Sequence, residues 1–123
     1  MMKILLAIAA VNGFLAVALG AFGAHGLEGK ISAKMILTWE KAVTYQMFHT
    51  GALLVTAFAM LKIQATSLNW AGITFLIGII LFSGSLYFYS TTGIKSLAMI
   101  TPIGGVFFLI GWILFGYAIL KFL

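Results

Sequence analysis

Hydrophobic residues occur in four long runs along the chain, and polar residues gather between these runs. The first run covers residues 4–24 and contains no charged side chain. Three more runs cover residues 43–61, 70–89 and 102–120. Because a helix rises ~1.5 Å per residue, about 20 apolar residues cross the hydrocarbon core of a bilayer. The pattern therefore predicts an all-α membrane protein, a four-transmembrane-helix bundle that forms one integral membrane domain over residues 1–123.

The segment between the first two runs, residues 25–42, mixes charged and apolar side chains. Its apolar residues recur at spacings of three and four: Ile31, Met35, Ile36 and Trp39. This spacing is typical of an amphipathic helix, which we expect to lie in the membrane interface with Trp39 as an anchor. The lysines of the segment are then a solvated face rather than a binding patch: Lys30, Lys34 and Lys41.

Two boundaries have alternatives. Lys3 followed by an apolar run is also typical of a signal peptide with a cleavage site, but the length of the run and its interruption at Asn12 favour a membrane span. At the last run, Thr101 followed by Pro102 is typical of an N-cap with proline in the first turn. The alternative is a helix that begins at Ser96 and kinks at Pro102.

The lysines do not decide which way the protein crosses the membrane. With four spans, both termini and the 62–69 turn share one side, side A, whereas residues 25–42 and 90–101 share side B. Side A carries three lysines and side B carries four: Lys3, Lys62 and Lys121 against Lys30, Lys34, Lys41 and Lys95. The positive-inside rule therefore leaves the orientation open.

Polar residues from all four runs fall in the half of the membrane next to side B. His49 lies six residues inside its run, about 9 Å deep, with Gln46 and Thr50 on the same helix face. The third run leaves the membrane on side B, and the fourth enters there. We therefore predict a polar layer around His49 with these members: Gln46, His49, Thr50, Ser83, Ser85, Thr101 and His25.

His49 has three candidate roles. As a neutral ring it can satisfy both nitrogens through Gln46, Ser83, Thr101 or backbone carbonyls and so stabilise helix packing. As an intramembrane ionisable residue it is also a candidate for transport, proton relay or ligand binding. Metal binding is the weakest role, because two histidines without a suitably spaced carboxylate do not complete a site.

Small residues mark the faces where helices approach closely. In lipid, helix association depends on such close approach. The candidates for packing are Gly13, Gly20, Gly104, Gly105 and Gly111, several of them one heptad apart. We expect these grooves to serve the bundle first, and any homo-oligomer or membrane partner protein to use what is left on the first or fourth helix.

Composition and charge narrow the range of possible functions. Hydrophobic residues make up 63% of the chain, charged residues 7%, and the mean hydropathy is +1.20. The net charge of +5 comes from lysine alone, which argues against nucleic-acid binding and makes membrane lipids the expected partners. There is no cysteine, and the only carboxylates are Glu28 and Glu40 in the surface segment. We therefore expect no enzyme, no cofactor and no metal site.

Four separated motifs follow one another along nearly the whole chain: GAFGAHGL at 20–27, YQMFHT at 45–50, LFSGSLY at 81–87 and TPIGGVFFLIGW at 101–112. Together they resemble the signature segments of the membrane family called domain of unknown function 423, which includes the eukaryotic transmembrane protein 256. The resemblance implies a small four-span protein of the plasma or inner membrane and implies no activity. We expect a non-catalytic membrane module that binds lipid or a partner protein. The alternative is a small channel or transporter that uses the polar layer.

Overall fold

The computed structural model describes residues 1–123 and contains helices joined by short turns, with no strand. Its elements are α1 (Met2–Gly26), α2 (Ala33–Ala59), α3 (Thr66–Gly78), the π-helix η1 (Ile79–Ser83), α4 (Gly84–Thr92), α5 (Lys95–Ala98) and α6 (Thr101–Phe122). Because α3, η1 and α4 follow one another without a break, they form one long rod. The prediction of an all-α protein is confirmed.

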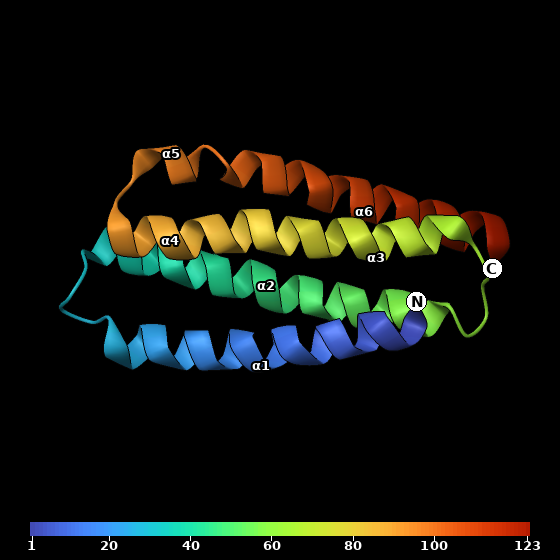
Figure 1. Ribbon diagram of the computed structural model, residues 1–123, viewed down its shortest axis with the longest axis horizontal. Helices are drawn as coiled ribbons and strands as arrows, with labels where there is room; N and C mark the ends of the chain where they lie inside the picture. Colours follow the sequence, from blue (N-terminus) through green and yellow to red (C-terminus); the bar gives the residue numbers. More distant parts are fainter.

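The long helices lie side by side, with both termini at one end of the molecule (Figure 1). α2 packs against α1 and also against α3, η1 and α4, while α6 packs along α3 and η1. The turn between α1 and α2 lies at the opposite end, together with α5. The termini and the turn after α2 therefore lie at the same end of the molecule, the end that corresponds to the predicted side A.

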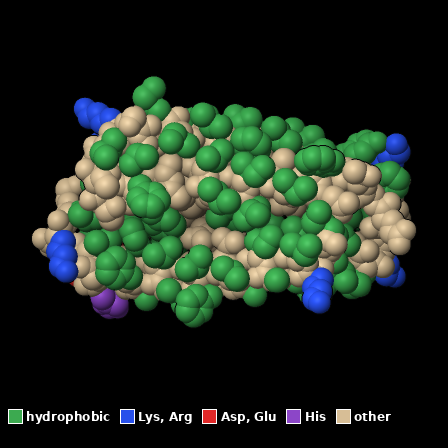
Figure 2. Space-filling view, viewed as in Figure 1, with side chains coloured by type: hydrophobic (Ala, Val, Ile, Leu, Met, Phe, Trp, Pro, Cys, Tyr) green, Lys and Arg blue, Asp and Glu red, His purple; other side chains and the backbone are tan.

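Three helical stretches are long and apolar enough to cross a membrane: Met2–Gly26, Thr66–Thr92 and Lys95–Phe122. α2 is more polar, but its Gln46, His49, Thr50 and Thr56 side chains are buried against neighbouring helices. Hydrophobic side chains cover most of the visible surface, and the lysines lie toward the two ends (Figure 2). A surface of this kind suits a lipid environment.

Residues 25–42 do not form a separate interfacial helix, so this part of the prediction is wrong. Residues 27–32 make a turn, and the Ser32 hydroxyl caps α2 by accepting a hydrogen bond of 3.2 Å from the Met35 backbone N–H. Residues 33–42 are the first turns of α2 itself. The helix continues because no glycine or proline stands between these turns and the apolar part that follows.

Trp39 is a buried packing residue rather than an interfacial anchor. Its side chain is only 5% exposed, and its indole N–H donates to the Leu19 carbonyl of α1 over 2.8 Å. Gly23 makes room for the ring, since a Cβ at Gly23 would collide with the indole. The aromatic residue thus fastens the start of α2 to the end of α1.

The helices approach most closely where glycines face bulky neighbours. A Cβ at Gly104 would lie 2.7 Å from the Phe82 Cα, so α6 comes against the backbone of η1 there. The other predicted packing glycines also face neighbouring helices: Gly13 toward Thr50, Gly20 toward Val43, Gly105 toward Phe82 and Gly111 toward Phe75. Gly72 and Gly78 also face neighbouring helices, at Leu5 and Phe108. The spacing of small residues in the sequence did not predict these two contacts.

The start of the last long helix differs from both expectations. Ile100 is the N-cap, Thr101 is the first residue of α6, and no side chain caps the helix. The prediction that Thr101 is the N-cap is therefore wrong by one residue. The alternative of a helix beginning at Ser96 is not seen either, because the separate helix α5 ends at Ala98, before α6 begins.

Candidate functional site

Three polar side chains from three helices form a chain of hydrogen bonds, which we call the amide network: Asn12, Gln46 and Tyr87. The Tyr87 hydroxyl of α4 donates to Gln46 Oε1 over 2.7 Å. Gln46 Nε2 of α2 donates to Asn12 Oδ1 over 3.0 Å, and Asn12 Nδ2 of α1 donates to the Ile8 carbonyl one turn earlier. The network therefore joins α1, α2 and α4 through groups that would be costly to leave unpaired in lipid.

Hydroxyl groups connect the third rod, which consists of α3, η1 and α4, to the helices on both sides of it. Ser83, the last residue of η1, donates to the Ala42 carbonyl of α2 over 2.8 Å. The hydroxyls of Ser85 and Thr101 are 2.6 Å apart and join α4 to α6. A π-turn such as η1 is uncommon in a helix and often occurs at functional sites. Here it ends at Ser83, directly before the second hydroxyl contact at Ser85.

His49 lies in an aromatic setting, which we call the histidine site: His49, Tyr45, Phe108 and Trp112. The imidazole stacks on the Phe108 ring, with centroids 3.6 Å apart and planes 8° from parallel. The Trp112 indole N–H lies 3.1 Å from His49 Nε2, and His49 Nδ1 lies 2.9 Å from the Tyr45 carbonyl. Because an indole can only donate, Nε2 is the acceptor and Nδ1 carries the proton. The neutral ring therefore has both nitrogens occupied.

The predicted polar residues do not form one hydrogen-bonded group. Gln46, His49, Thr50, Ser83 and Ser85 are buried, Thr101 is half-buried, and His25 is exposed at the end of α1. His49 does not bond to Gln46, Ser83 or Thr101, so those expected partners are wrong, whereas a backbone carbonyl is among its actual partners. The Thr50 hydroxyl turns back to the Gln46 carbonyl of its own helix over 2.7 Å.

Trp112 is the residue of this site that sequence reasoning missed. It follows Phe108 by four residues, so both side chains lie on the same face of α6. That spacing, inside the TPIGGVFFLIGW motif, was the available signal. Because Trp112 lies in the middle of an apolar run, the apolar pattern accounts for it as part of that run and does not predict that its indole N–H donates to His49.

The site offers little for catalysis or metal binding. No group of three or more His, Cys, Asp or Glu side chains is placed to hold a metal ion. No serine or threonine hydroxyl is hydrogen-bonded to His49, so the pair that would activate a nucleophile is not assembled. The arrangement can hold helices together and can present grooves to the surrounding lipid.

Several hollows open on the surface. One of them, the α1–α4 groove, has a volume of about 520 Å³. Its lining includes Asn12, Leu15, Gln46, Ile80, Gly84 and Leu97. A second hollow of about 330 Å³ lies beside Thr44, Tyr45, Phe48 and His49.

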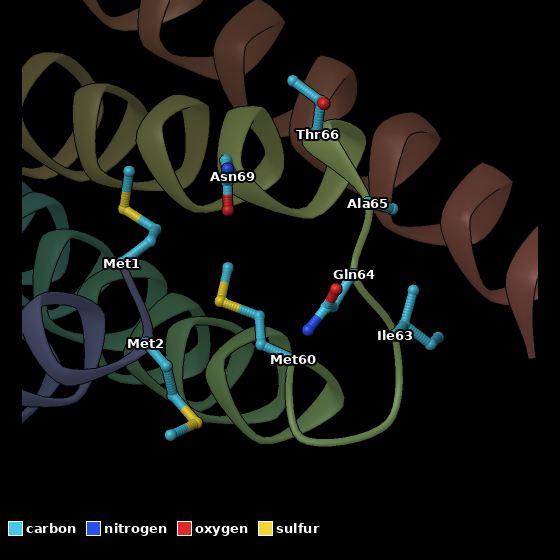
Figure 3. Close-up of a pocket in the computed structure, with 8 residues that line it drawn as sticks. All are labelled: Met1, Met2, Met60, Ile63, Gln64, Ala65, Thr66 and Asn69. Atoms are coloured by element: carbon cyan, nitrogen blue, oxygen red, sulfur yellow. The ribbon is translucent and has the colours of Figure 1, made fainter.

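The third hollow lies at the side A end, next to the turn between α2 and α3. Its volume is about 380 Å³. Figure 3 shows the methionine side chains of Met1, Met2 and Met60 on one side of it, with Gln64 and Asn69 nearby. The flexible thioether side chains can fill such an irregular space.

The fold and these sites define a small all-helical membrane protein whose buried polar side chains are hydrogen-bonded within the protein, to backbone carbonyls and to one another. The chain belongs to the family described as Protein of unknown function (DUF423), which matches residues 19–105. The resemblance noted from the motifs is thereby confirmed.

Similar proteins match over nearly their whole length. A UPF0382 membrane protein of Staphylococcus epidermidis is 50% identical over 121 residues, 98% of each chain. The UPF0382 membrane protein YwdK of Bacillus subtilis is 49% identical over 123 residues, 99% of this chain and all of its own. A relative from Staphylococcus aureus is 51% identical over 121 residues, 98% of each chain. No solved structure matches this chain.

Proposed function

We propose that this protein is a non-catalytic, four-span module of the cell membrane that binds a membrane component, either a lipid or a partner protein. The observation that carries the proposal is the contrast between its interior and its grooves. Buried polar side chains are hydrogen-bonded within the protein, while the α1–α4 groove reaches the amide network but is otherwise lined mostly by apolar side chains. A groove of this composition suits hydrocarbon or an apolar helix.

Four crossings are favoured because α2 runs alongside the three apolar candidates. With 27 residues at ~1.5 Å each, α2 is about 40 Å long, enough to cross the hydrocarbon core. From Gln46 onward its polar side chains are buried against other helices, so lipid meets mainly residues such as Leu54, Val55 and Phe58. The relatives are named membrane proteins, which supports a membrane location for this chain as well.

The channel or transporter alternative receives less support. A conduit needs polar groups that can exchange partners with water or with an ion along a path. In the histidine site both ring nitrogens are occupied by protein groups, and in the amide network both side-chain oxygens accept hydrogen bonds from protein groups. These contacts favour a role in helix packing over a role in conduction.

The proposal is tested by extracting the protein from its native membrane into polymer-bounded discs and then exchanging it into mild detergent. We expect a lipid or a protein to remain bound in a fixed ratio of about one per chain or per oligomer. A control protein of equal size with uninterrupted apolar helices should keep none. If the protein leaves the discs with neither lipid nor protein attached, the proposal is wrong.

A further inference from the structure

We propose that the α1–α4 groove is a binding site for one anionic glycerophospholipid, with an acyl chain along the groove, the ester oxygens at the amide network and the phosphate beside Lys95. This inference rests on the proposed function and specifies its ligand. The groove runs between α1 and the η1–α4 part of the third rod, and residues at the end of α5 and beyond it complete its wall.

The first support is hydrogen-bonding capacity that the protein leaves unused. A primary amide carries two N–H groups. Asn12 Nδ2 donates one hydrogen bond, to Ile8, and Gln46 Nε2 donates one, to Asn12. Both residues line the groove, and both are more than nine-tenths buried, with 8% and 4% exposure. A donor beside hydrocarbon is stabilised by an acceptor that comes with the occupant, and an ester carbonyl is such an acceptor.

The second support is the position of charge at the end of the groove. Leu97 and Ile100 line the groove at side B, and Lys95 begins α5 two residues before Leu97. Lys95 is exposed, so its ammonium group can reach a headgroup. Side B carries four lysines against two glutamates, which favours an anionic over a zwitterionic phosphate.

The distances along the helices agree with one lipid spanning both features. Tyr87, which bonds to Gln46, stands five residues before the end of α4, about 7 Å along the helix axis. In a glycerophospholipid the phosphate and the ester oxygens are separated by only a few bonds. A phosphate near Lys95 therefore leaves its ester groups near the amide network and its acyl chain among Leu76, Ile79 and Ile80, which line the groove farther toward side A.

A second copy of the chain fits the groove less well. Many of the side chains exposed between the two ends are hydrophobic, such as Phe14, Val17 and Phe58, and these side chains bring no acceptor for the free amide N–H groups (Figure 2). A helix from a second copy would need a polar side chain at the depth of the amide network to accept these hydrogen bonds. A phospholipid carries its acceptors at the required end of every molecule.

The experiment fills the groove without disturbing its walls. A Cβ at Gly84 would meet nothing within 4 Å, and Gly84 lines the groove, so Gly84→Leu places a side chain in the acyl path. Gly116 also has open space around its Cβ position but lies on α6, away from this groove, so Gly116→Leu is the matched control. Ile80→Trp is a second filling variant at an exposed lining position, for use if Gly84→Leu does not fold.

Native mass spectrometry of each detergent-purified variant, titrated with phosphatidylglycerol or phosphatidylcholine, measures the bound lipid. We expect the wild type and Gly116→Leu to keep one phosphatidylglycerol under conditions that strip annular lipid, and the filling variants to lose it. Lys95→Gln should reduce the preference for phosphatidylglycerol over phosphatidylcholine by about fivefold, the factor expected for one lysine near an anionic lipid. Lys62→Gln, at side A, should leave the preference unchanged.

Several results would overturn the inference. Equal lipid retention by Gly84→Leu, Ile80→Trp and Gly116→Leu would show that the lipid binds elsewhere, and the broader proposed function would survive. If a filling variant abolishes a dimer and leaves lipid binding unchanged, the occupant of the groove is a second copy of the chain. If Lys95→Gln and the wild type show the same preference for phosphatidylglycerol over phosphatidylcholine, the phosphate does not bind beside Lys95. Wild-type protein that keeps neither lipid nor partner would end both proposals.

Discussion

Substitution of His49 tests whether the histidine site stabilises helix packing. His49→Leu removes the hydrogen bond from Trp112, the one to the Tyr45 carbonyl and the stack on Phe108. Hydrogen bonds between membrane helices contribute about 0.6–1 kcal/mol each, and an aromatic stack contributes about 0.5–1.5 kcal/mol. The free energy of unfolding should therefore fall by about 2–3 kcal/mol. His49→Gln keeps a donor and an acceptor at the site and should lose about half as much.

The assay is reversible unfolding in mixed micelles, followed by tryptophan fluorescence and by helical circular dichroism. Val55→Leu, at a lipid-exposed position of the same helix, is the matched control and should change stability by less than about 0.5 kcal/mol. If His49→Leu is as stable as His49→Gln and Val55→Leu, the histidine site contributes no packing energy and the reasoning is wrong.

A double-mutant cycle isolates the contact between the two aromatic side chains. His49→Leu and Trp112→Phe each remove the indole–imidazole hydrogen bond, so the pair should show a coupling energy of about 0.6–1 kcal/mol. A coupling energy near zero would mean that the 3.1 Å contact stabilises nothing. The result would leave the stack on Phe108 and the hydrogen bond to the Tyr45 carbonyl as the remaining contributions to test.

Three further substitutions test separate contacts by the same unfolding assay. Gly104→Ala should destabilise by about 1–2 kcal/mol, because overpacking against the Phe82 backbone exceeds the gain in helix propensity. Gly105→Ala, whose Cβ would lie 3.9 Å from the Phe82 ring, should be neutral, and equal losses would contradict the close approach. Tyr87→Phe should cost about 1 kcal/mol by removing the 2.7 Å bond to the network's glutamine, and an unchanged midpoint would disprove that bond's contribution. Ser32→Ala should cost about 1 kcal/mol through the lost cap of α2, visible as reduced helicity before the main transition, and wild-type melting would count against it.

The sequence predicted the helices well because the apolar runs are long and uninterrupted. The runs at 4–24, 70–89 and 102–120 lie within helical segments of the structure. The predicted start of the second helix at residue 43 was wrong because periodicity shows which face of a helix is apolar, but not whether two helical segments join. Residues 33–42 are amphipathic, yet their apolar face meets α1 rather than the membrane interface, as the contact of Trp39 with Leu19 illustrates.

The candidate site was only partly predictable, for a geometrical reason. Depth along a helix can be counted from the sequence, so the burial of Gln46, His49 and Ser83 followed from spacing. The rotation of each helix about its own axis cannot be counted in this way. That rotation decides that His49 meets Trp112 while Gln46 meets Asn12, so one predicted layer becomes separate groups of contacts.

Ion permeability is the measurement that most directly tests a binding module against a conduit. The protein is reconstituted into sealed vesicles that carry a proton gradient, and an internal pH-sensitive dye records the decay of the gradient. The nitrogens of His49 and the oxygens of the amide network are occupied by protein groups. We therefore predict that the gradient in vesicles with the protein decays at the same rate as in vesicles without it. A faster decay that His49→Leu abolishes would contradict the proposal and assign conduction to the histidine site.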